Sequence, residues 1–389
     1  MKNLCDKYAR KLVAQGLSAP GDPIVGGLDA ELVWNREDPR TTELAKVFDG
    51  LSINSLVFSR TTEPYRTIID FLATRHDDFI QPEDTETRTF MHDIPICRDF
   101  SAEGIIENLK KRKAVLIPGQ GIISYGTVSP EQGFVFYSSA AFACFVRFFS
   151  EYMEAAKRGD IDPEYQAAFD KAVSHLPSPL TDMPKLDIGP HNDEDSILTA
   201  MAQAGRGVVE YSLVDSFFGN ISYRLNDTIY ISQTASSLDE LEGCIDPCAM
   251  DGSLTTGLTA SSELTAHEDV FRQTDADCIL HGHPRFSVIM SMDCDKIDCE
   301  NRGQCHIKCS EHRSVAGVPI VPGEIGTGPT GLCNTLPPAI ASSGAALVHG
   351  HGLFTSGKKD FNEPFRRLLE TENRCRALYF DRIDALTKD

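Results

Sequence analysis

The sequence has little positive charge and almost no tryptophan for its length. Its 389 residues include 37 Lys+Arg against 57 Asp+Glu, a formal net charge of −20, and a single Trp. This balance argues against nucleic acid as a partner, because clustered Lys and Arg side chains supply the binding to phosphate backbones. A small anionic substrate remains compatible, because a local group of hydrogen-bond donors is enough to bind it.

Long hydrophobic runs are also missing. The most apolar stretch, 134–149, has 16 residues and contains Arg147, whereas a membrane span needs about 20 apolar residues. We therefore expect a buried helix at 134–149 and no membrane partner. Residues 1–16 are polar and amphipathic and lack the apolar centre of a signal peptide. The expected location is cytoplasmic, where the 12 cysteines would be thiols or metal ligands rather than disulfides.

Proline marks the clearest boundary in the chain. The segment 176–190 contains four prolines in fifteen residues, which excludes a continuous helix or a central strand. A chain of this length is expected to form two domains. We predict an N-terminal α/β domain at 1–176, a proline-rich linker at 177–191 and a second domain at 192–389.

The second domain mixes helical and extended patterns. Helical spacing or apolar faces predict helices at 193–204, 262–273 (with Ser262 as its cap) and 360–379. Short β-like runs predict strands at 221–225, 228–233, 277–280 and 345–348, the first two joined by a tight turn at Asn226 and Asp227. Hairpins with flanking helices favour an α+β fold or a layered α/β/α fold over regular βαβ repetition.

A weak internal repeat links the two halves. Residues 112–126 parallel 344–357, and residues 54–69 fall about where 277–290 fall in the second half. The same order of strand, glycine turn and long helix recurs, which favours a tandem duplication. In that alignment Gln120 matches His351, and the counterparts of His281 and His283 fall near Ser59 and Thr61, so the first copy would lack a metal site.

Three histidines form the strongest chemical signal. His281 and His283 alternate on a predicted strand, so both side chains point to one face and can bind one ion. His351 ends another predicted strand beside two glycines, which allow a close approach of the backbone. Three imidazoles that leave a fourth position open are typical of a catalytic zinc site.

Four motifs then occur in order: GNIS at 219–222, TASSE at 259–263, HGHP at 281–284 and HGLFTSG at 351–357. In this order they resemble the class II aldolase/adducin family, over roughly 193–378. The resemblance implies a central antiparallel sheet flanked by helices, a divalent metal that is usually zinc, and homo-oligomers. Together with the internal repeat, it suggests that the first half is a degenerate copy of the same fold.

The resemblance also implies roles for single residues. The metal ligands fall on His281, His283 and His351, and the catalytic carboxylate falls on Glu263, where the epimerases have Asp. Ala235 stands where the aldolases often have Gly. The phosphate-binding groups fall on Asn220, Thr234, Ala235, Ser261 and Ser262.

The expected function is that of a zinc-dependent aldolase, a lyase acting on a phosphorylated ketose or related keto-alcohol through a metal-stabilised enediolate. Two alternatives within the family are a sugar-phosphate dehydratase or epimerase, and a non-catalytic adducin-like binding protein. A metal- or redox-sensing protein is a third. Some members use a tyrosine from a neighbouring subunit as proton donor, but no Tyr occurs between Cys294 and Ala346. Glu324, Thr327 and Thr330 are the substitutes available in that region.

A cysteine-rich insert at 294–309 interrupts the second domain. Its four cysteines are Cys294, Cys299, Cys305 and Cys309. The insert has little apolar content, so burial alone cannot fold it. The spacing leaves structural zinc, an iron–sulfur cluster, and disulfides or free thiols open. We predict a second metal site here, near the rim of the first.

Overall fold

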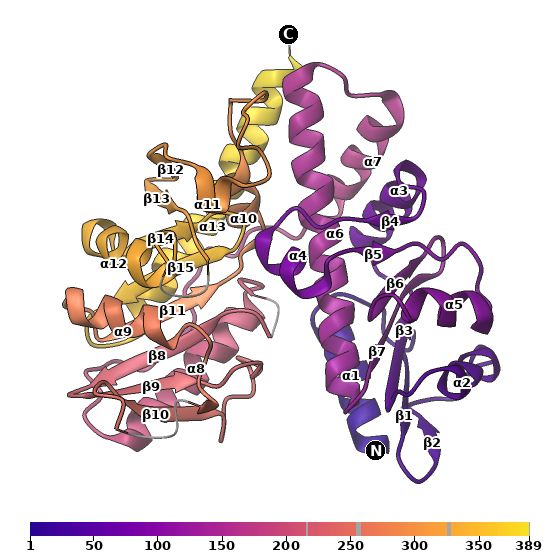
Figure 1. The fold of residues 1–389 in the computed structure, drawn as a ribbon, viewed down its shortest axis with the longest axis horizontal. Helices are drawn as coiled ribbons and strands as arrows, with labels where there is room; N and C mark the ends of the chain where they lie inside the picture. Colours follow the sequence, from indigo (N-terminus) through magenta and orange to yellow (C-terminus); the bar gives the residue numbers. More distant parts are fainter. Residues whose placement is uncertain (215–216, 254–257, 325–327, 389) are drawn as a thin grey trace. The chain divides into compact units, whose positions relative to one another are not determined.

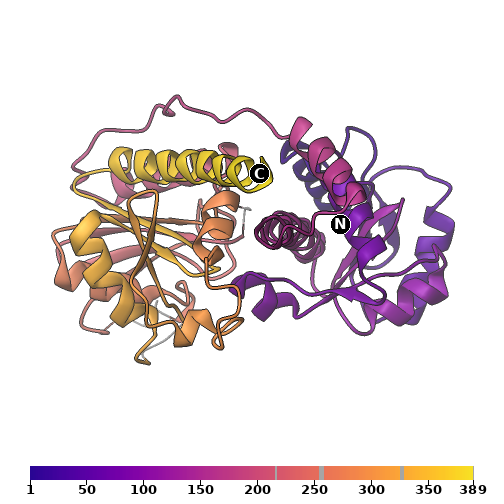
Figure 2. The same ribbon diagram turned by 90° about the horizontal axis from the view of Figure 1, so that it is seen from above.

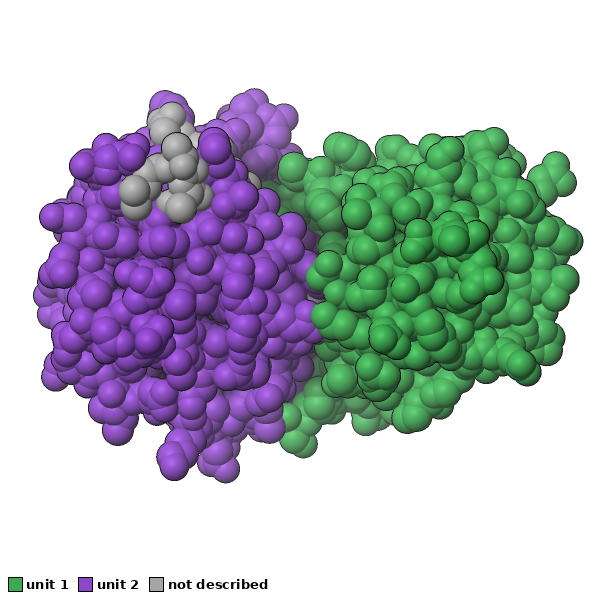
Figure 3. All heavy atoms as spheres, turned by 90° about the horizontal axis from the view of Figure 1, so that it is seen from below, with its two compact units in different colours: residues 1–178 green, residues 179–389 purple. Residues whose placement is uncertain are grey.

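The computed structural model describes residues 1–388 except 215–216, 254–257 and 325–327. The chain forms two compact units, Met1–Ser178 and Pro179–Asp389, which Figure 3 shows in separate colours. Between His175 and Asp193 the chain has neither helix nor strand, as four prolines in 176–190 require.

Both units combine helices with one main sheet (Figure 1). The helices of unit 1 are α1 (Lys2–Ala14), α2 (Thr41–Gly50), α3 (Tyr65–Arg75), α4 (Thr85–Met91), α5 (Ala102–Leu109), α6 (Pro130–Arg158) and α7 (Pro163–Ser174). Its strands are β1 (Ile24–Leu28), β2 (Leu32–Trp34), β3 (Ser55–Ser59), β4 (Phe79–Ile80), β5 (Ile94–Pro95), β6 (Ala114–Ile117) and β7 (Gly121–Gly126).

Unit 2 is built in the same way around a longer sheet. Its helices are α8 (Glu194–Glu210), α9 (Leu264–Gln273), α10 (Arg285–Met292), α11 (Cys305–Lys308), α12 (Leu332–Ser343) and α13 (Asn362–Thr387). Its strands are β8 (Asn220–Leu225), β9 (Thr228–Ser232), β10 (Ile245–Ala249), β11 (Cys278–Gly282), β12 (Arg313–Val315), β13 (Val318–Val321), β14 (Ala345–Val348) and β15 (Gly352–Gly357).

The sheet of unit 2 lies between two helical layers (Figure 2). Cys278 and Leu280 of β11 join the core formed with α8 and α13, whereas Ile279 joins the core formed with α9 and α12. Successive side chains of a strand point to opposite faces. His281, which follows Leu280, therefore lies on the face that α9 and α12 cover. The layered α/β fold with a central, mainly antiparallel sheet is as expected.

The most apolar stretch of the chain lies inside unit 1. Helix α6 is long and apolar enough to cross a membrane by length and composition, but 89% of its most apolar window is buried within the protein. Core helices pass the same test. The prediction of a buried helix at 134–149 is confirmed, and α6 contacts α1, β3 and β7.

The two units follow one order of elements. The unit 1 sheet runs β2-β1-β3-β7-β6, and the middle of the unit 2 sheet runs β9-β8-β11-β15-β14, with antiparallel neighbours throughout. In unit 1, α2 and α5 share a core on one face, as α9 and α12 do in unit 2. In unit 1, Ile96, directly after β5, forms an isolated parallel bridge to Leu116 of β6. In unit 2, β13 pairs in parallel with β14, the counterpart of β6.

Side-chain hydrogen bonds outside the regular ladder recur at matched positions. They join a strand to its neighbour or to the start of the last helix, which is local chemistry that the sheet order alone does not require. In the first matched pair, a strand N–H donates to a side chain on or directly after the neighbouring strand: Val25 N to Asn35 Oδ1 (2.7 Å) in unit 1 and Ile221 N to Ser232 Oγ (3.2 Å) in unit 2. In the second pair, a strand hydroxyl donates to a carbonyl in the first turn of the last helix: Ser124 Oγ to Gly133 O (2.7 Å) and Thr355 Oγ1 to Pro364 O (3.0 Å). In the third pair, a strand side chain donates to a carbonyl just before that helix: Ser55 Oγ to Ser129 O (2.7 Å) and Cys278 Sγ to Asp360 O (3.0 Å).

Several element boundaries differ from the sequence-based expectation, among them the end of α8, which lies at Glu210 instead of 204. The helix expected from Ser262 begins at Leu264, and Glu263 occupies the N-cap position without a side-chain cap bond. Ser261 supplies the local contact instead, because its Oγ accepts a hydrogen bond from the Glu263 N–H at 3.3 Å. The last helix extends to Thr387, beyond the predicted end at 379, and Ile383 remains buried along it.

Asp84 gives unit 1 a pH-dependent contribution to stability. Its carboxylate is fully buried at the N-cap of α4 and accepts hydrogen bonds from the Thr87 N–H (2.7 Å) and the Thr87 hydroxyl. Burial raises the pKa of Asp84 to about 6 from 3.8. The folded state therefore binds this proton more tightly than the unfolded chain. The resulting stabilisation is full below pH ~4 and is lost as the pH rises through ~6.

We predict that Asp84→Asn, which keeps an N-cap acceptor, gains stability relative to the wild type as the pH rises from ~4 to ~7. The gain should be on the order of 3 kcal/mol, since one pKa unit corresponds to about 1.4 kcal/mol. Urea unfolding at three pH values measures it. A difference between variant and wild type that does not change with pH would contradict the assignment.

Candidate metal centre and active site

Three imidazoles meet at one end of the β11–β15 pair. His281 is the fourth residue of β11, His283 follows that strand, and His351 directly precedes β15. One ligand atom from each ring lies within 4.8 Å of the others, and all three residues are buried. Among the described residues, this is the only group of three or more His, Cys, Asp or Glu that meets in this way.

Glycines make the approach of these rings possible. A Cβ added to Gly352 would lie 2.5 Å from the Gly282 carbonyl oxygen and 2.7 Å from the His281 ring. Gly350, on the other side of His351, has φ +61°, a conformation that glycine adopts without strain. The HGHG and HGHP sequences are therefore what allow the strands to bring the rings together.

Each of the three imidazoles brings one nitrogen atom into a common group that could hold a metal ion. His281 Nδ1 lies 3.2 Å from the Leu353 carbonyl oxygen. That carbonyl holds the proton on Nδ1 and leaves the Nε2 lone pair free. The Nε2 atoms of His281 and His283 face each other at 3.0 Å, close to the roughly 3.3 Å that separates two nitrogens bound to one tetrahedral zinc ion. The residues present therefore fit a divalent metal.

Burial disfavours the charged form of His281 and His283. It lowers the pKa of His281 to about 3 and places the pKa of His283 well below its ordinary value. A neutral imidazole has the lone pair that a metal ion requires. The aromatic rings around the histidines were not anticipated from the sequence: Phe354 stacks on His281 at 3.7 Å and Phe218 stacks on His283 at 5.2 Å between ring centroids.

One carboxylate lies against the imidazoles. Glu263 Oε1 is 3.2 Å from His351 Nε2, and Oε2 is 3.7 Å from His281 Nε2. Asn220 Nδ2 donates a hydrogen bond to Oε2 at 2.5 Å. Burial raises the pKa of Glu263, but His281, His351 and the Asn220 amide outweigh it and hold the pKa below its usual range. The carboxylate is therefore ionised and available as a proton acceptor.

The residues that the resemblance assigns to phosphate lie on two adjacent loops. Gln233 and Ala260 form an isolated bridge between these loops, and Thr234 Oγ1 donates to the Ala260 carbonyl at 2.8 Å. Ala235 has φ +59°, the region that favours the glycine found there in aldolases. Thr234, Ala235 and Ser262 are exposed and Ser261 is buried. Asn220 differs from them, because its amide is engaged by Glu263.

The cysteine-rich insert shows no comparable meeting of side chains. Cys294, Cys299, Cys305 and Cys309 are partly exposed and form no disulfide, and among the described residues they form no metal-binding group. Cys305 and Cys309 lie at the two ends of α11. The His306 carbonyl accepts a hydrogen bond from the Gly323 N–H at 3.0 Å, which ties α11 to the segment after β13. The second metal site stays a prediction.

The expected substitutes for a proton-donating tyrosine are only partly described. Glu324 accepts a hydrogen bond from the Thr330 hydroxyl at 2.7 Å and is exposed. Thr327 lies outside the described residues. Among the described residues, neither Glu324 nor Thr330 forms a hydrogen bond or ion pair with the three histidines.

The matched position in unit 1 carries different chemistry. The sheet register places Phe58 opposite Ile24 as His281 lies opposite Asn220. The counterparts of His281 and His283 are therefore Phe58 and Arg60, one residue before the Ser59 and Thr61 expected from the alignment. Because strand side chains alternate, that shift moves each counterpart to the other face of the sheet.

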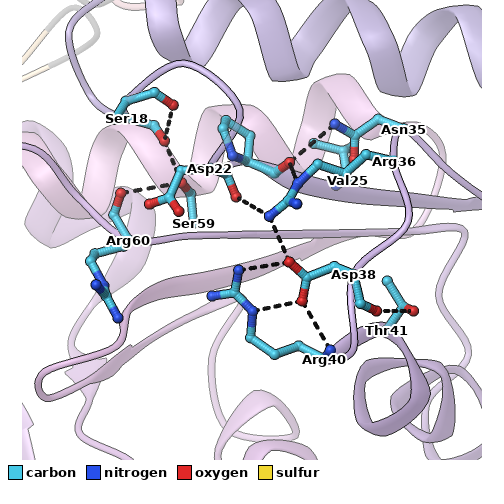
Figure 4. Close-up of polar contacts among 12 residues, drawn as sticks. Ser18, Asp22, Val25, Asn35, Arg36, Asp38, Arg40, Thr41, Ser59 and Arg60 are labelled. Carbon is cyan, nitrogen blue, oxygen red and sulfur yellow. Dashed lines mark hydrogen bonds and ion pairs between the residues drawn. The ribbon is translucent and has the colours of Figure 1, made fainter.

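An arginine occupies the place of the carboxylate in unit 1 (Figure 4). Arg40 is the N-cap of α2, as Glu263 is of α9, and its guanidinium lies 5.2 Å from the centre of the Phe58 ring. Both Asp38 oxygens accept from Arg40, at 2.8 and 2.9 Å, and Arg36 binds the same carboxylate at 2.7 Å. These arginines hold the pKa of Asp38 well below its usual range. A fixed cation here does not suit a metal ion.

Fold and site together define the class of unit 2: a layered domain in which three imidazoles at one end of the β11–β15 pair meet a carboxylate from the N-cap of α9. Residues 199–379 match the family model of the Class II Aldolase and Adducin N-terminal domain. The C-terminal half of the chain is a class II aldolase/adducin domain. No curated protein matches the sequence significantly.

Solved structures of the same kind align with half of the chain. L-fuculose-1-phosphate aldolase from Thermus thermophilus is 20% identical, and the alignment covers 50% of this chain and 100% of that one, with a TM-score of 0.40. A sugar-phosphate aldolase from Thermotoga maritima is 16% identical, with coverage of 50% and 97% and a TM-score of 0.37. An N-terminal class II aldolase domain from Thermoplasma acidophilum is 12% identical, with coverage of 48% and 96% and a TM-score of 0.33.

Glu372 of α13 supports the segment that follows His283. Its carboxylate accepts hydrogen bonds from the N–H groups of Phe286 and Ser287, at 2.9 and 2.8 Å, and from the Ser287 hydroxyl at 2.8 Å. These donors belong to the first turn of α10, which has no other side-chain cap. Burial raises the pKa of Glu372.

We predict that Glu372→Ala lowers the free energy of unfolding by about 1–3 kcal/mol, because buried N–H groups lose their acceptor. Glu370→Ala, an exposed position on the same helix, is the matched control and should change it by less than about 0.5 kcal/mol. Urea midpoints measure both variants. Equal midpoints for the two would contradict the supporting role of Glu372.

Proposed function

We propose that the protein is a divalent-metal-dependent lyase of the aldolase type, acting on a phosphorylated ketose or a related keto-alcohol. One observation carries the proposal: three buried imidazoles converge beside one buried carboxylate. A domain that only binds a partner has no need for this costly arrangement, because buried charge is expensive unless it is paired. The family of unit 2 supports the same conclusion.

His281, His283 and His351 are the proposed metal ligands, and zinc is the proposed ion. When bound, such an ion supplies Lewis-acid chemistry, which draws electron density from a carbonyl group. The residues around it hold the ligands ready: the Leu353 carbonyl orients His281, and Phe354 and Phe218 pack against two of the rings. These apolar contacts also exclude water from the ligand side of the site.

Glu263 is the proposed general base and acid. Its ionised carboxylate accepts a proton from the substrate carbon or hydroxyl and returns it after the bond change. Asn220 holds Oε2 in place, which leaves Oε1 as the oxygen able to take the proton. Thr234, Ala235, Ser261 and Ser262 are proposed to bind the substrate phosphate with hydroxyl and N–H groups. Ser261 and Ser262 lie just before α9, where the helix dipole favours an anion.

Unit 1 is proposed to be a second copy of the same fold without a metal site. The matched order of elements and the matched side-chain hydrogen bonds support a tandem duplication. This copy has Phe58, Arg60 and Gln120 in place of the three histidines. Its proposed role is therefore assembly or active-site completion. Homo-oligomers are proposed on the same basis as for the family.

A sugar-phosphate dehydratase or epimerase remains the alternative within the family. It would use the same ligands and a carboxylate at the same position, so product analysis rather than metal content distinguishes it from an aldolase. An adducin-like binding protein would turn over none of these substrates.

We predict that Glu263→Gln lowers kcat for aldol cleavage or addition with dihydroxyacetone phosphate by about 10²–10⁴-fold, because an amide cannot take up the proton. Bound metal should stay as in the wild type. Glu268→Gln, the same change on the same helix at a residue paired with Arg272, is the control and should keep full activity. A fully active Glu263→Gln variant would refute the role of this carboxylate.

We predict that the His281→Ala/His283→Ala variant loses one equivalent of metal per chain after anaerobic purification, while metal bound by the cysteine-rich insert persists. Replacing Cys294, Cys299, Cys305 and Cys309 with Ser should have the converse effect. Metal and sulfide analysis of the three proteins measures both sites. Equal metal in the histidine variant and the wild type would contradict the first site, and equal metal in the cysteine variant would contradict the second.

A further inference from the structure

A second polar contact joins β8 to α9 beneath the Glu263–Asn220 hydrogen bond. Ser222 Oγ lies 2.7 Å from His267 Nδ1, and both side chains are buried, at 0% and 1% exposed. Ser222 is two residues after Asn220 on the strand, and His267 is four residues after Glu263 on the helix. At these spacings each pair of residues points the same way. Strand and helix are therefore linked at two successive points.

His267 is connected to the site by packing as well. Its N–H donates to the Glu263 carbonyl at 3.1 Å and closes the first turn of α9. Its ring meets the edge of Phe354, at 6.0 Å between centroids, and Phe354 stacks on His281. A displacement of His267 would therefore move both the backbone of Glu263 and the ring that supports His281.

Unit 1 shows that the fold does not require this contact. The sheet register matches Gly26 with Ser222, and the helix starts match Leu44 with His267. Leu44 is fully buried, and the Trp34 ring occupies the space beside Gly26, where a Cβ would lie 2.5 Å from it. An apolar contact thus closes the same strand–helix junction in the unit that has Arg40 in place of a catalytic carboxylate.

A buried serine–histidine pair is more costly to form than an apolar contact, because both polar groups lose their water. His267 Nε2 also has no hydrogen-bond partner among the described residues. The pair occurs in the unit with the carboxylate and is replaced by apolar residues in the unit without it.

We propose that Ser222 and His267 are positioning residues, which fix the first turn of α9 on β8 so that the Glu263 carboxylate stays against His351 and His281. The proposal rests on the proposed function of Glu263 as the proton-transferring group. Neither side chain is the proton acceptor itself. Their loss should lower kcat without changing substrate binding or metal content.

Four variants test the proposal. Ser222→Ala and His267→Leu remove the contact, and His267→Leu introduces the residue type found at Leu44. His267→Asn retains a polar atom near the position of Nδ1. Ser124→Ala, which removes a buried serine hydroxyl bonded to Gly133 in unit 1, is the control for the chemical change alone.

We expect Ser222→Ala and His267→Leu to lower kcat about 10–100-fold, the usual effect of removing a group that orients a functional residue. KM and metal per chain should stay within about twofold of the wild type. His267→Asn should recover most of kcat, and Ser124→Ala should keep all of it. Amide hydrogen exchange should become faster for residues 264–267 in the first two variants only.

Two results would overturn the proposal. In the first, kcat and exchange rates are unchanged in Ser222→Ala and His267→Leu. In the second, kcat falls together with the bound metal, and His267→Asn does not restore it. Failure of the proposed function is separate. In that case the wild type itself would turn over none of the phosphorylated substrates, while the hydrogen-exchange pattern would still report whether the contact fixes α9.

Discussion

The arrangement of unit 2 depends on one buried carboxylate. Glu263 is 5% exposed and ionised, and a buried charge without partners would cost several kcal/mol. The imidazoles of His281 and His351 and the Asn220 amide contact it. Much of the local sequence serves this requirement, from the glycines that let the histidines approach to the helix start that aims the carboxylate at them.

The sheet provides the geometry that the carboxylate needs. Alternation along β11 places His281 on the face covered by α9, and the antiparallel register sets it opposite Asn220 on one side and Phe354 on the other. The site is therefore assembled from neighbouring strands of the sheet plus the N-cap residue of a helix. Unit 1 keeps the sheet and the helix start but carries Phe58 and Arg40 at these positions, so the same framework presents a cation instead.

Much of unit 2 could be predicted from its sequence because the signals are local. The Asn226–Asp227 turn, with Asn226 at φ +54°, the strand at 278–282 and the three convergent histidines follow from spacing and alternation. Two features could not be predicted from the sequence: the start of α9, and the counterparts of the histidines in unit 1. Both depend on a shift of one or two residues that only packing decides. His267 was missed because a lone histidine on a helical face has no distinctive local pattern, although its spacing of four from Glu263 was visible.

The central claim is that His281, His283 and His351 hold one divalent metal ion, and cobalt substitution tests it most directly. Co²⁺ bound to imidazoles in a tetrahedral site has characteristic visible absorption, and His349→Ala provides a control for His351→Ala only two residues away. We predict that titration with Co²⁺ gives the same spectrum and end point for the wild type and His349→Ala, and that His351→Ala loses them. Identical spectra for all three proteins would contradict the metal centre described here.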